Sequence, residues 1–146
     1  MQQHYRSPLD FSDENIARAE NLLERLYISL HQSTEAPSSQ TSSDLLLRKM
    51  EDSLADDFNS AKALGDLLSS IRGCFRDNKS DDWAALKPAF GLLNKVFGIC
   101  LEEPKIFLSE NKSRKLKRWN VTEEFTSQIE ARMKDRETAR SQKDFK

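Results

Sequence analysis

Apolar residues recur at steps of three and four along most of this chain, which is the spacing of one face of an α-helix. No stretch of four to eight residues alternates apolar with polar side chains, and valine occurs only twice, so β-strands have almost no material. A chain of 146 residues is long enough to bury a core within one domain. The sequence therefore predicts a single all-α domain, residues 1–146, built as a helical bundle of four to five helices.

Polar residues and helix caps divide this pattern into segments. The first helix is predicted to begin after Ser12, whose hydroxyl can accept from a backbone N–H of the first turn, and to run to about His31. The polar residues 33–43 predict a flexible loop, after which a short second helix begins. Asn59 or Ser60 is a suitable cap for the third helix.

The second half of the chain contains two more predicted helices. A regular apolar seam begins at Trp83 and predicts a helix that Pro88 either kinks or starts, because a proline ring clashes with the preceding turn. Residues 101–120 are rich in Lys and Arg and are expected to form a basic linker. Thr122 is predicted to cap the last helix, of which residues 121–146 are expected to be only the start.

Few residues offer the chemistry of a catalytic or metal site. The two cysteines, Cys74 and Cys100, stand in apolar stretches and are interpreted as core thiols. The two histidines, His4 and His31, have no partner at the spacing of a triad or a ligand set, and the four glycines are too scattered for a phosphate-binding loop. The sequence therefore predicts no catalytic, cofactor-binding or metal-binding residue.

No part of the sequence resembles a signal peptide or a membrane span. The first ten residues lack an apolar core, and no run approaches the roughly 18 apolar residues that a span needs. We therefore expect a soluble, cytoplasmic chain that makes no membrane contact.

The formal net charge of −1 conceals two parts of opposite sign. Residues 1–104 contain 11 basic and 17 acidic side chains, whereas residues 105–146 contain 12 and 7. Four cations of the last helix recur at steps of four, four and three, which places them on one helical face: Arg132, Arg136, Arg140 and Lys143. Like charges at this spacing repel, so a bound polyanion would stabilise them. The alternative is a solvated face that acidic residues of the same or a neighbouring helix neutralise.

Three ordered blocks of sequence carry a specific likeness to one family. The blocks are His4-Tyr5-Arg6-Ser7-Pro8-Leu9-Asp10-Phe11-Ser12, followed by Ala17-Arg18-Ala19 and Leu23-Glu24-Arg25-Leu26-Tyr27; Asp56-Asp57-Phe58-Asn59-Ser60 with Ala63-Leu64; and Ile129, Arg136 and Ala139-Arg140 with Lys143-Asp144-Phe145. They resemble the bacterial-type cysteinyl-tRNA synthetases. The second block is similar to the family's Asp-Asp-Phe-Asn-Thr-Pro-x-Ala-Leu signature, with Ser and Ala in place of Thr and Pro.

The resemblance implies the helical domain that packs beside the tRNA anticodon stem, of the kind grouped with DALR anticodon-binding domains. Residues 1–11 then correspond to the junction with a missing catalytic domain of the same polypeptide. The family's His-x-Gly-His and Lys-Met-Ser-Lys-Ser signatures, zinc-binding cysteines and nucleotide-binding fold have no counterparts in this sequence. The parent enzyme would use zinc and ATP to attach cysteine to its tRNA, whereas this chain alone is expected to be inactive and to hold no cofactor.

The resemblance makes the row of cations the predicted tRNA-binding residues. Arg136, Arg140 and Lys143 stand at positions that match the family, whereas Arg132 stands where the family often has an apolar residue. Cations on a rigid helix suit the phosphates of an RNA stem. Two other functions remain open. One is the helical domain of a related ligase that joins cysteine to an amino sugar, and the other is a structural module that mediates subunit contacts.

Overall fold

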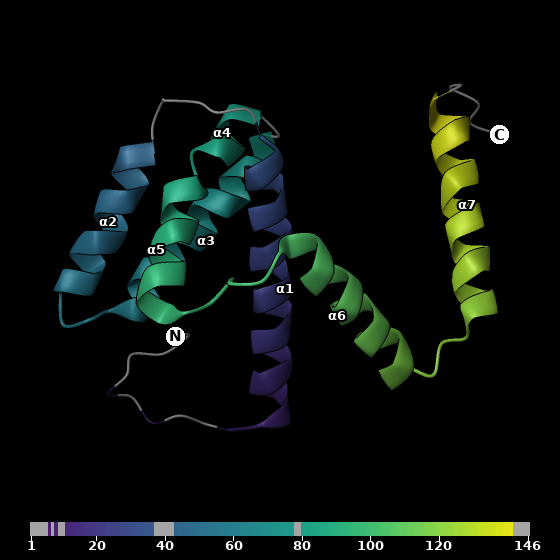
Figure 1. The fold of residues 1–146 in the computed structure, drawn as a ribbon, viewed down its shortest axis with the longest axis horizontal. Coiled ribbons are helices and arrows are strands. Elements are labelled where there is room, and N and C mark those ends of the chain that lie inside the picture. The colour runs from purple at the N-terminus through teal and green to yellow at the C-terminus, as the bar shows by residue number, and fades with distance from the viewer. Residues whose placement is uncertain (1–5, 7, 9–10, 37–42, 78–79, 142–146) are drawn as a thin grey trace. The chain divides into compact units, whose positions relative to one another are not determined.

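The computed structural model describes residues 6, 8, 11–36, 43–77 and 80–141, and these residues are all-α, as the sequence predicts (Figure 1). The helices are α1 (Asp13–Glu35), α2 (Ser43–Ala55), α3 (Ser60–Asp77), α4 (Ser80–Ala84), α5 (Lys87–Phe97), α6 (Pro104–Arg118) and α7 (Glu123–Ser141). The expected number of four to five helices was too low. The predicted fourth helix is divided into α4 and α5, and the predicted basic linker contains α6.

Polar caps start α1 and α3 at the predicted positions. The Ser12 hydroxyl accepts from the Asn15 backbone N–H at 3.4 Å, and α1 begins at Asp13. The Asn59 carboxamide oxygen accepts in the same way at 3.0 Å, just before α3. The first helix continues past His31 to Glu35, so the predicted loop begins later than expected. Its residues 37–42 lie outside the described part of the chain.

A tight turn separates α4 from α5. The Leu86 N–H donates to the Trp83 carbonyl at 3.1 Å, and Pro88 stands in the first turn of α5, where its missing N–H leaves no helical hydrogen bond unmade. Pro88 therefore starts a helix and does not kink one. The turn preserves the phase of the apolar seam, because Trp83, Leu86, Phe90 and Leu93 are all buried.

The core lies among the first five helices. α2 packs against α3 and α5, and α1 packs against α4 and α5. The largest completely buried apolar side chains are Met50, Leu67, Ile71, Leu86 and Leu93. Cys74 and Cys100 are buried free thiols, which confirms their interpretation as core residues.

By their internal contacts, residues 1–108 and 109–146 form two compact units. The boundary falls within α6. In the first unit, the Phe107 ring stacks on Tyr27 with ring centroids 3.6 Å apart, so the first turn of α6 is attached to α1.

A helix replaces the predicted linker because its start and its composition both favour one. Pro104 occupies the first position of α6, and the Glu103 carboxylate accepts from the Ile106 N–H at 2.9 Å. Lys and Arg are good helix formers, so a run of cations does not interrupt a helix. Among the described residues, no helix is both long and apolar enough to cross a membrane.

Candidate nucleic-acid interface

The last helix begins where Thr122 caps it, as the sequence predicts. The Phe125 N–H donates to Thr122 Oγ1 at 3.3 Å, and α7 follows without interruption to Ser141. This helix belongs to the second compact unit together with most of α6. The cap fixes the phase of the helix, and the phase determines which side chains share a face.

Three of the four predicted RNA-binding residues lie on α7. Arg132, Arg136 and Arg140 are all exposed, and we call them the arginine row. At about 100° per residue, their positions span about 80° around the helix axis, so they share one face. Lys143 lies outside the described residues.

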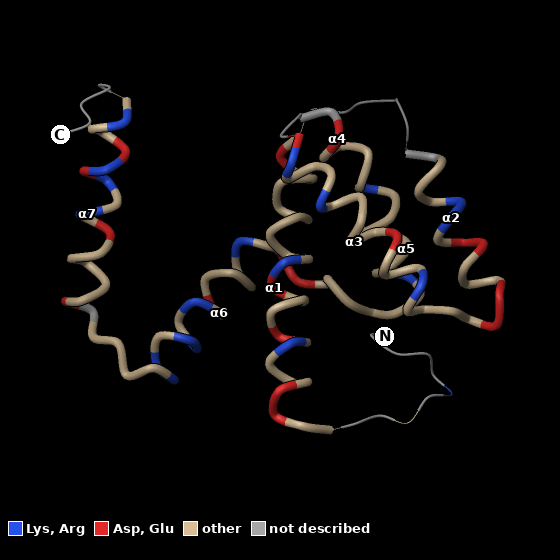
Figure 2. Tube along the Cα trace, turned by 180° about the vertical axis from the view of Figure 1, so that it is seen from behind, with Lys and Arg blue, Asp and Glu red and all other residues tan. Residues whose placement is uncertain are grey.

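Two acidic residues of α7, Asp135 and Glu137, flank the arginine row, and each stands three residues from one of its arginines. By the helical period, Glu130, Asp135 and Glu137 are each about 100° or more from the centre of the row. Figure 2 shows the two signs of charge interspersed along α7. The Lys112 ammonium nitrogen lies 2.8 Å from Glu130 Oε1, so Glu130 is directed to α6. Within the described ranges, none of the three guanidinium groups forms an ion pair with a carboxylate.

The other side of α7 faces α6 within the second unit. A cavity of about 480 Å³ is lined from α6 and the following turn by Leu116 and Val121 among others, and from α7 by Thr126 and Ser127. Together with Glu130, these two α7 residues lie about 80° to 180° from the centre of the arginine row. The row is therefore directed away from α6, with its guanidinium groups open to solvent.

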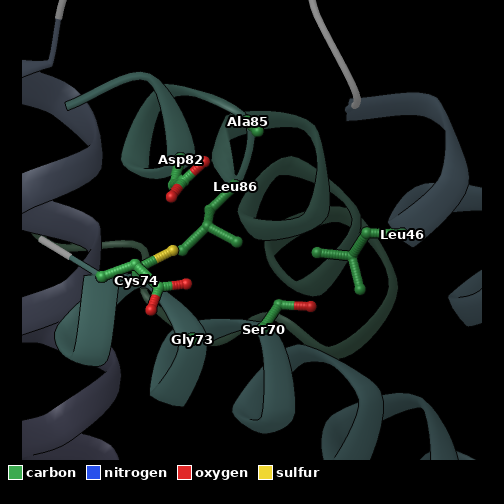
Figure 3. A pocket seen from close by; sticks show the side chains of 8 residues that line it. Leu46, Ser70, Gly73, Cys74, Asp82, Ala85 and Leu86 are labelled. Atoms are coloured by element: carbon green, nitrogen blue, oxygen red, sulfur yellow. The ribbon is translucent and has the colours of Figure 1, made fainter. Parts of the chain in front are cut away.

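A cavity of about 280 Å³ in the first unit is an alternative place for a small ligand (Figure 3). Asp82 and Ser70 contribute oxygen atoms to its lining, Cys74 contributes a thiol, and Leu46 and Leu86 contribute apolar surface. Burial raises the pKa of the Cys74 thiol, and a protonated thiol is a poor nucleophile and a poor metal ligand. Among the described residues, no group of three His, Cys, Asp or Glu side chains is positioned to hold a metal ion. The arginine row is therefore the better-supported site.

We expect Cys100 to react slowly with thiol reagents. Burial raises the pKa of its thiol from 9.0 to about 11. The thiolate is the reactive form, so at pH 8 the reactive fraction is about 100-fold smaller than for an unshifted thiol. Alkylation by iodoacetamide at pH 8, followed by peptide mass spectrometry, should be about 100-fold slower in the native chain than in the urea-unfolded chain. Equal rates in the two states would contradict the prediction.

The chain is similar over nearly its whole length to curated proteins named cysteine–tRNA ligase. The protein from Geobacter sp. strain M21 is 33% identical over an alignment of 159 positions that covers 98% of this chain and 32% of the relative. The Geobacter metallireducens protein is 34% identical, with 98% and 33% covered, and the Trichlorobacter lovleyi protein is 31% identical, with 100% and 34% covered. No family model matches the chain.

The alignment to the Trichlorobacter lovleyi protein covers 100% of the chain, so it extends through the regions of all three sequence blocks. The chain spans about a third of the length of the relatives that it matches. The likeness predicted from the blocks is confirmed: this chain is homologous to cysteine–tRNA ligases over about one third of such a protein.

Proposed function

We propose that this chain is the helical, tRNA-contacting part of a cysteine–tRNA ligase, and that the arginine row binds the sugar-phosphate backbone of the anticodon stem. The observation that carries the proposal is the row itself. Its three exposed guanidinium groups share one face of α7 and have no carboxylate partner among the described residues. The relatives are named for a reaction on tRNA, so RNA is the polyanion that we expect the arginine row to bind.

The dimensions and chemistry of the row suit an RNA stem. From Arg132 to Arg140 the helix rises about 12 Å, a length over which one nucleic-acid strand passes several phosphates. A guanidinium group can donate two parallel hydrogen bonds to a phosphate, so its preferred geometry matches the backbone. Double-stranded RNA presents phosphates and 2′-hydroxyl groups more readily than base edges. The expected contact therefore holds the stem without reading its sequence.

The proposal assigns amino-acid activation to a catalytic domain outside this chain. The relatives are about three times as long as the chain, which is consistent with such a domain in the whole protein. In this proposal the chain positions tRNA for the catalytic domain, in the cytoplasm.

The test is the salt dependence of tRNA binding. Each neutralised phosphate changes the slope of log K against log salt by about −0.7 to −0.9, so three contacts predict a slope of about −2 to −3. In the Arg136→Ala/Arg140→Ala variant, the slope should become shallower by about 1.5, because two contacts are lost. Filter retention of labelled tRNA at several salt concentrations measures both slopes.

A matched control separates the arginine row from net charge. Arg48 and Lys49 are exposed on α2 in the first unit, so Arg48→Ala/Lys49→Ala also removes two positive charges, but outside α7. This control should keep the slope of the unmodified chain. An identical slope in both double variants would overturn the assignment to α7. Failure of the unmodified chain to bind tRNA at low salt would overturn the RNA-binding function and favour an amino-sugar ligase or a structural module.

A further inference from the structure

The two tryptophans of the chain have opposite environments. Trp83 is 5% exposed in the core, whereas Trp119 is 67% exposed at the end of α6. A tryptophan carries the largest apolar surface of any side chain, so an exposed one forgoes much of the stabilisation that its burial would provide. Neither the fold nor the arginine row accounts for its place on the surface.

The backbone holds Trp119 in a defined position. The Val121 N–H donates to the Leu116 carbonyl at 3.0 Å, and the Asn120 N–H donates to the Lys117 carbonyl at 3.2 Å. Asn120 has a φ of 51°, so these residues form the Schellman motif that ends many helices. Trp119 is the last residue before this left-handed position. Its ring is thus presented at a corner between α6 and α7, and ordering it on binding costs little backbone entropy.

The part of α6 that leads to Trp119 is rich in cations. Residues 111–122 contain five cations and no acidic residue. The two residues immediately before the tryptophan, Lys117 and Arg118, are both exposed. Cations favour the C-terminus of any helix through its dipole, but this effect is confined to the last turn. Lys112 and Arg114 lie before that turn, and Lys112 is paired with Glu130 of α7.

An exposed aromatic ring among cations fits single-stranded nucleic acid better than a protein surface. The centre of a protein interface is depleted in lysine, which argues against a protein partner at this place. Proteins that bind single strands combine aromatic side chains, on which bases stack, with cations that contact the phosphates. A paired base of an RNA stem has both faces covered by its neighbours, so only an unpaired base can offer a face to the ring.

We propose that Trp119 is a stacking platform for an unpaired base of RNA, with Lys117 and Arg118 contacting the flanking phosphates. The proposal rests on the proposed function in taking RNA as the ligand. It adds a second contact of a different kind, because the arginine row needs only phosphates, whereas Trp119 needs a base that has left the duplex. The ligand class is therefore RNA with a loop, bulge or free end.

The test compares a short oligoadenylate strand with an RNA duplex of equal phosphate count. Stacking should quench the fluorescence of Trp119 with the single strand and leave it nearly unchanged with the duplex. By fluorescence anisotropy of the labelled strand, Trp119→Ala should weaken binding about 5- to 100-fold, whereas Trp119→Phe should retain most of the affinity. The matched control is Phe11→Ala, because Phe11 is 81% exposed in the first unit and should not affect binding.

The outcomes separate this proposal from the proposed function. If Trp119→Ala binds the single strand as tightly as the unmodified chain, the stacking platform is wrong, while a slope change in Arg136→Ala/Arg140→Ala still supports the function. Equal quenching by the duplex would also overturn stacking. If neither RNA binds at low salt, both proposals fail. Circular dichroism of each variant checks that the helices are retained, as is expected for an exposed side chain.

Discussion

The Leu67→Ala variant is expected to lose about 3 kcal/mol of its free energy of unfolding, within a range of about 2–5 kcal/mol. Leu67 lies on α3 and is completely buried, so the substitution removes apolar contacts and leaves a cavity that the surrounding helices fill only in part. Domains of this size are stable by about 5–15 kcal/mol, so the loss is a large fraction of the total.

Urea unfolding measures this loss most directly with a probe in the core. In a Trp119→Phe background, Trp83 is the remaining tryptophan, and it is 5% exposed in the first unit. Its fluorescence should report a lower midpoint for Leu67→Ala. The matched control is Leu101→Ala, because Leu101 is 67% exposed and should change the free energy by no more than about 0.5 kcal/mol. An unchanged midpoint for Leu67→Ala would contradict the core assignment.

The starts of α1, α3 and α7 could be predicted from the sequence because single polar residues determine them. Ser12, Asn59 and Thr122 each accept from a backbone N–H of the first turn that follows, and each was identifiable from its residue type and the apolar period behind it. The division at Pro88 was harder to predict. The spacing of the apolar residues continues through the turn between α4 and α5. One kinked helix and two short helices would therefore give the same sequence pattern.

Helix α6 was missed because its apolar signal is weak. Phe107 and Leu108 are only partly buried, and the rest of the helix is mostly polar, so no clear apolar stripe marks it. The signal that was available is Pro104, which favours the first position of a helix, followed by good helix formers. The division into two compact units could not be predicted, because it depends on contacts between distant residues.

The sequence predicts that the arginines of the candidate site share one helical face, but it does not predict that they are exposed and unpaired with carboxylates. Spacing alone placed Arg132, Arg136 and Arg140 together, because the helical period is fixed. Spacing does not tell whether a carboxylate pairs with them, because pairing depends on how the helices fold together, as the contact of Glu130 with Lys112 of α6 shows. For the same reason, the sequence does not distinguish an exposed tryptophan from a buried one.

Reversal of the arginine row should have the largest effect on RNA binding. In Arg132→Glu/Arg136→Glu/Arg140→Glu, three phosphate contacts are lost and three like charges face the backbone. Each phosphate contact changes the slope by about 0.7–0.9, so it strengthens binding by roughly five- to eightfold when the salt concentration falls tenfold. The loss of three contacts should therefore weaken binding near 0.1 M salt by at least about 100-fold. The helix should persist, because Glu and Arg have similar helix propensities and all three positions are exposed.

The size of this effect is interpretable only against an equal change of charge elsewhere. Arg48→Glu/Lys49→Glu/Lys95→Glu makes the same change at exposed positions of α2 and α5. At 0.1 M salt the screening length is about 10 Å, so charges that do not touch the RNA should weaken binding only a few-fold. Filter retention of tRNA at 0.1 M salt compares the two triple variants. Equal losses would mean that net charge, and not the face of α7, controls binding. A loss of affinity that is confined to the variant of the arginine row requires direct contact with the RNA. Screening weakens the effect of distant charges equally in both variants, so it does not explain such a difference.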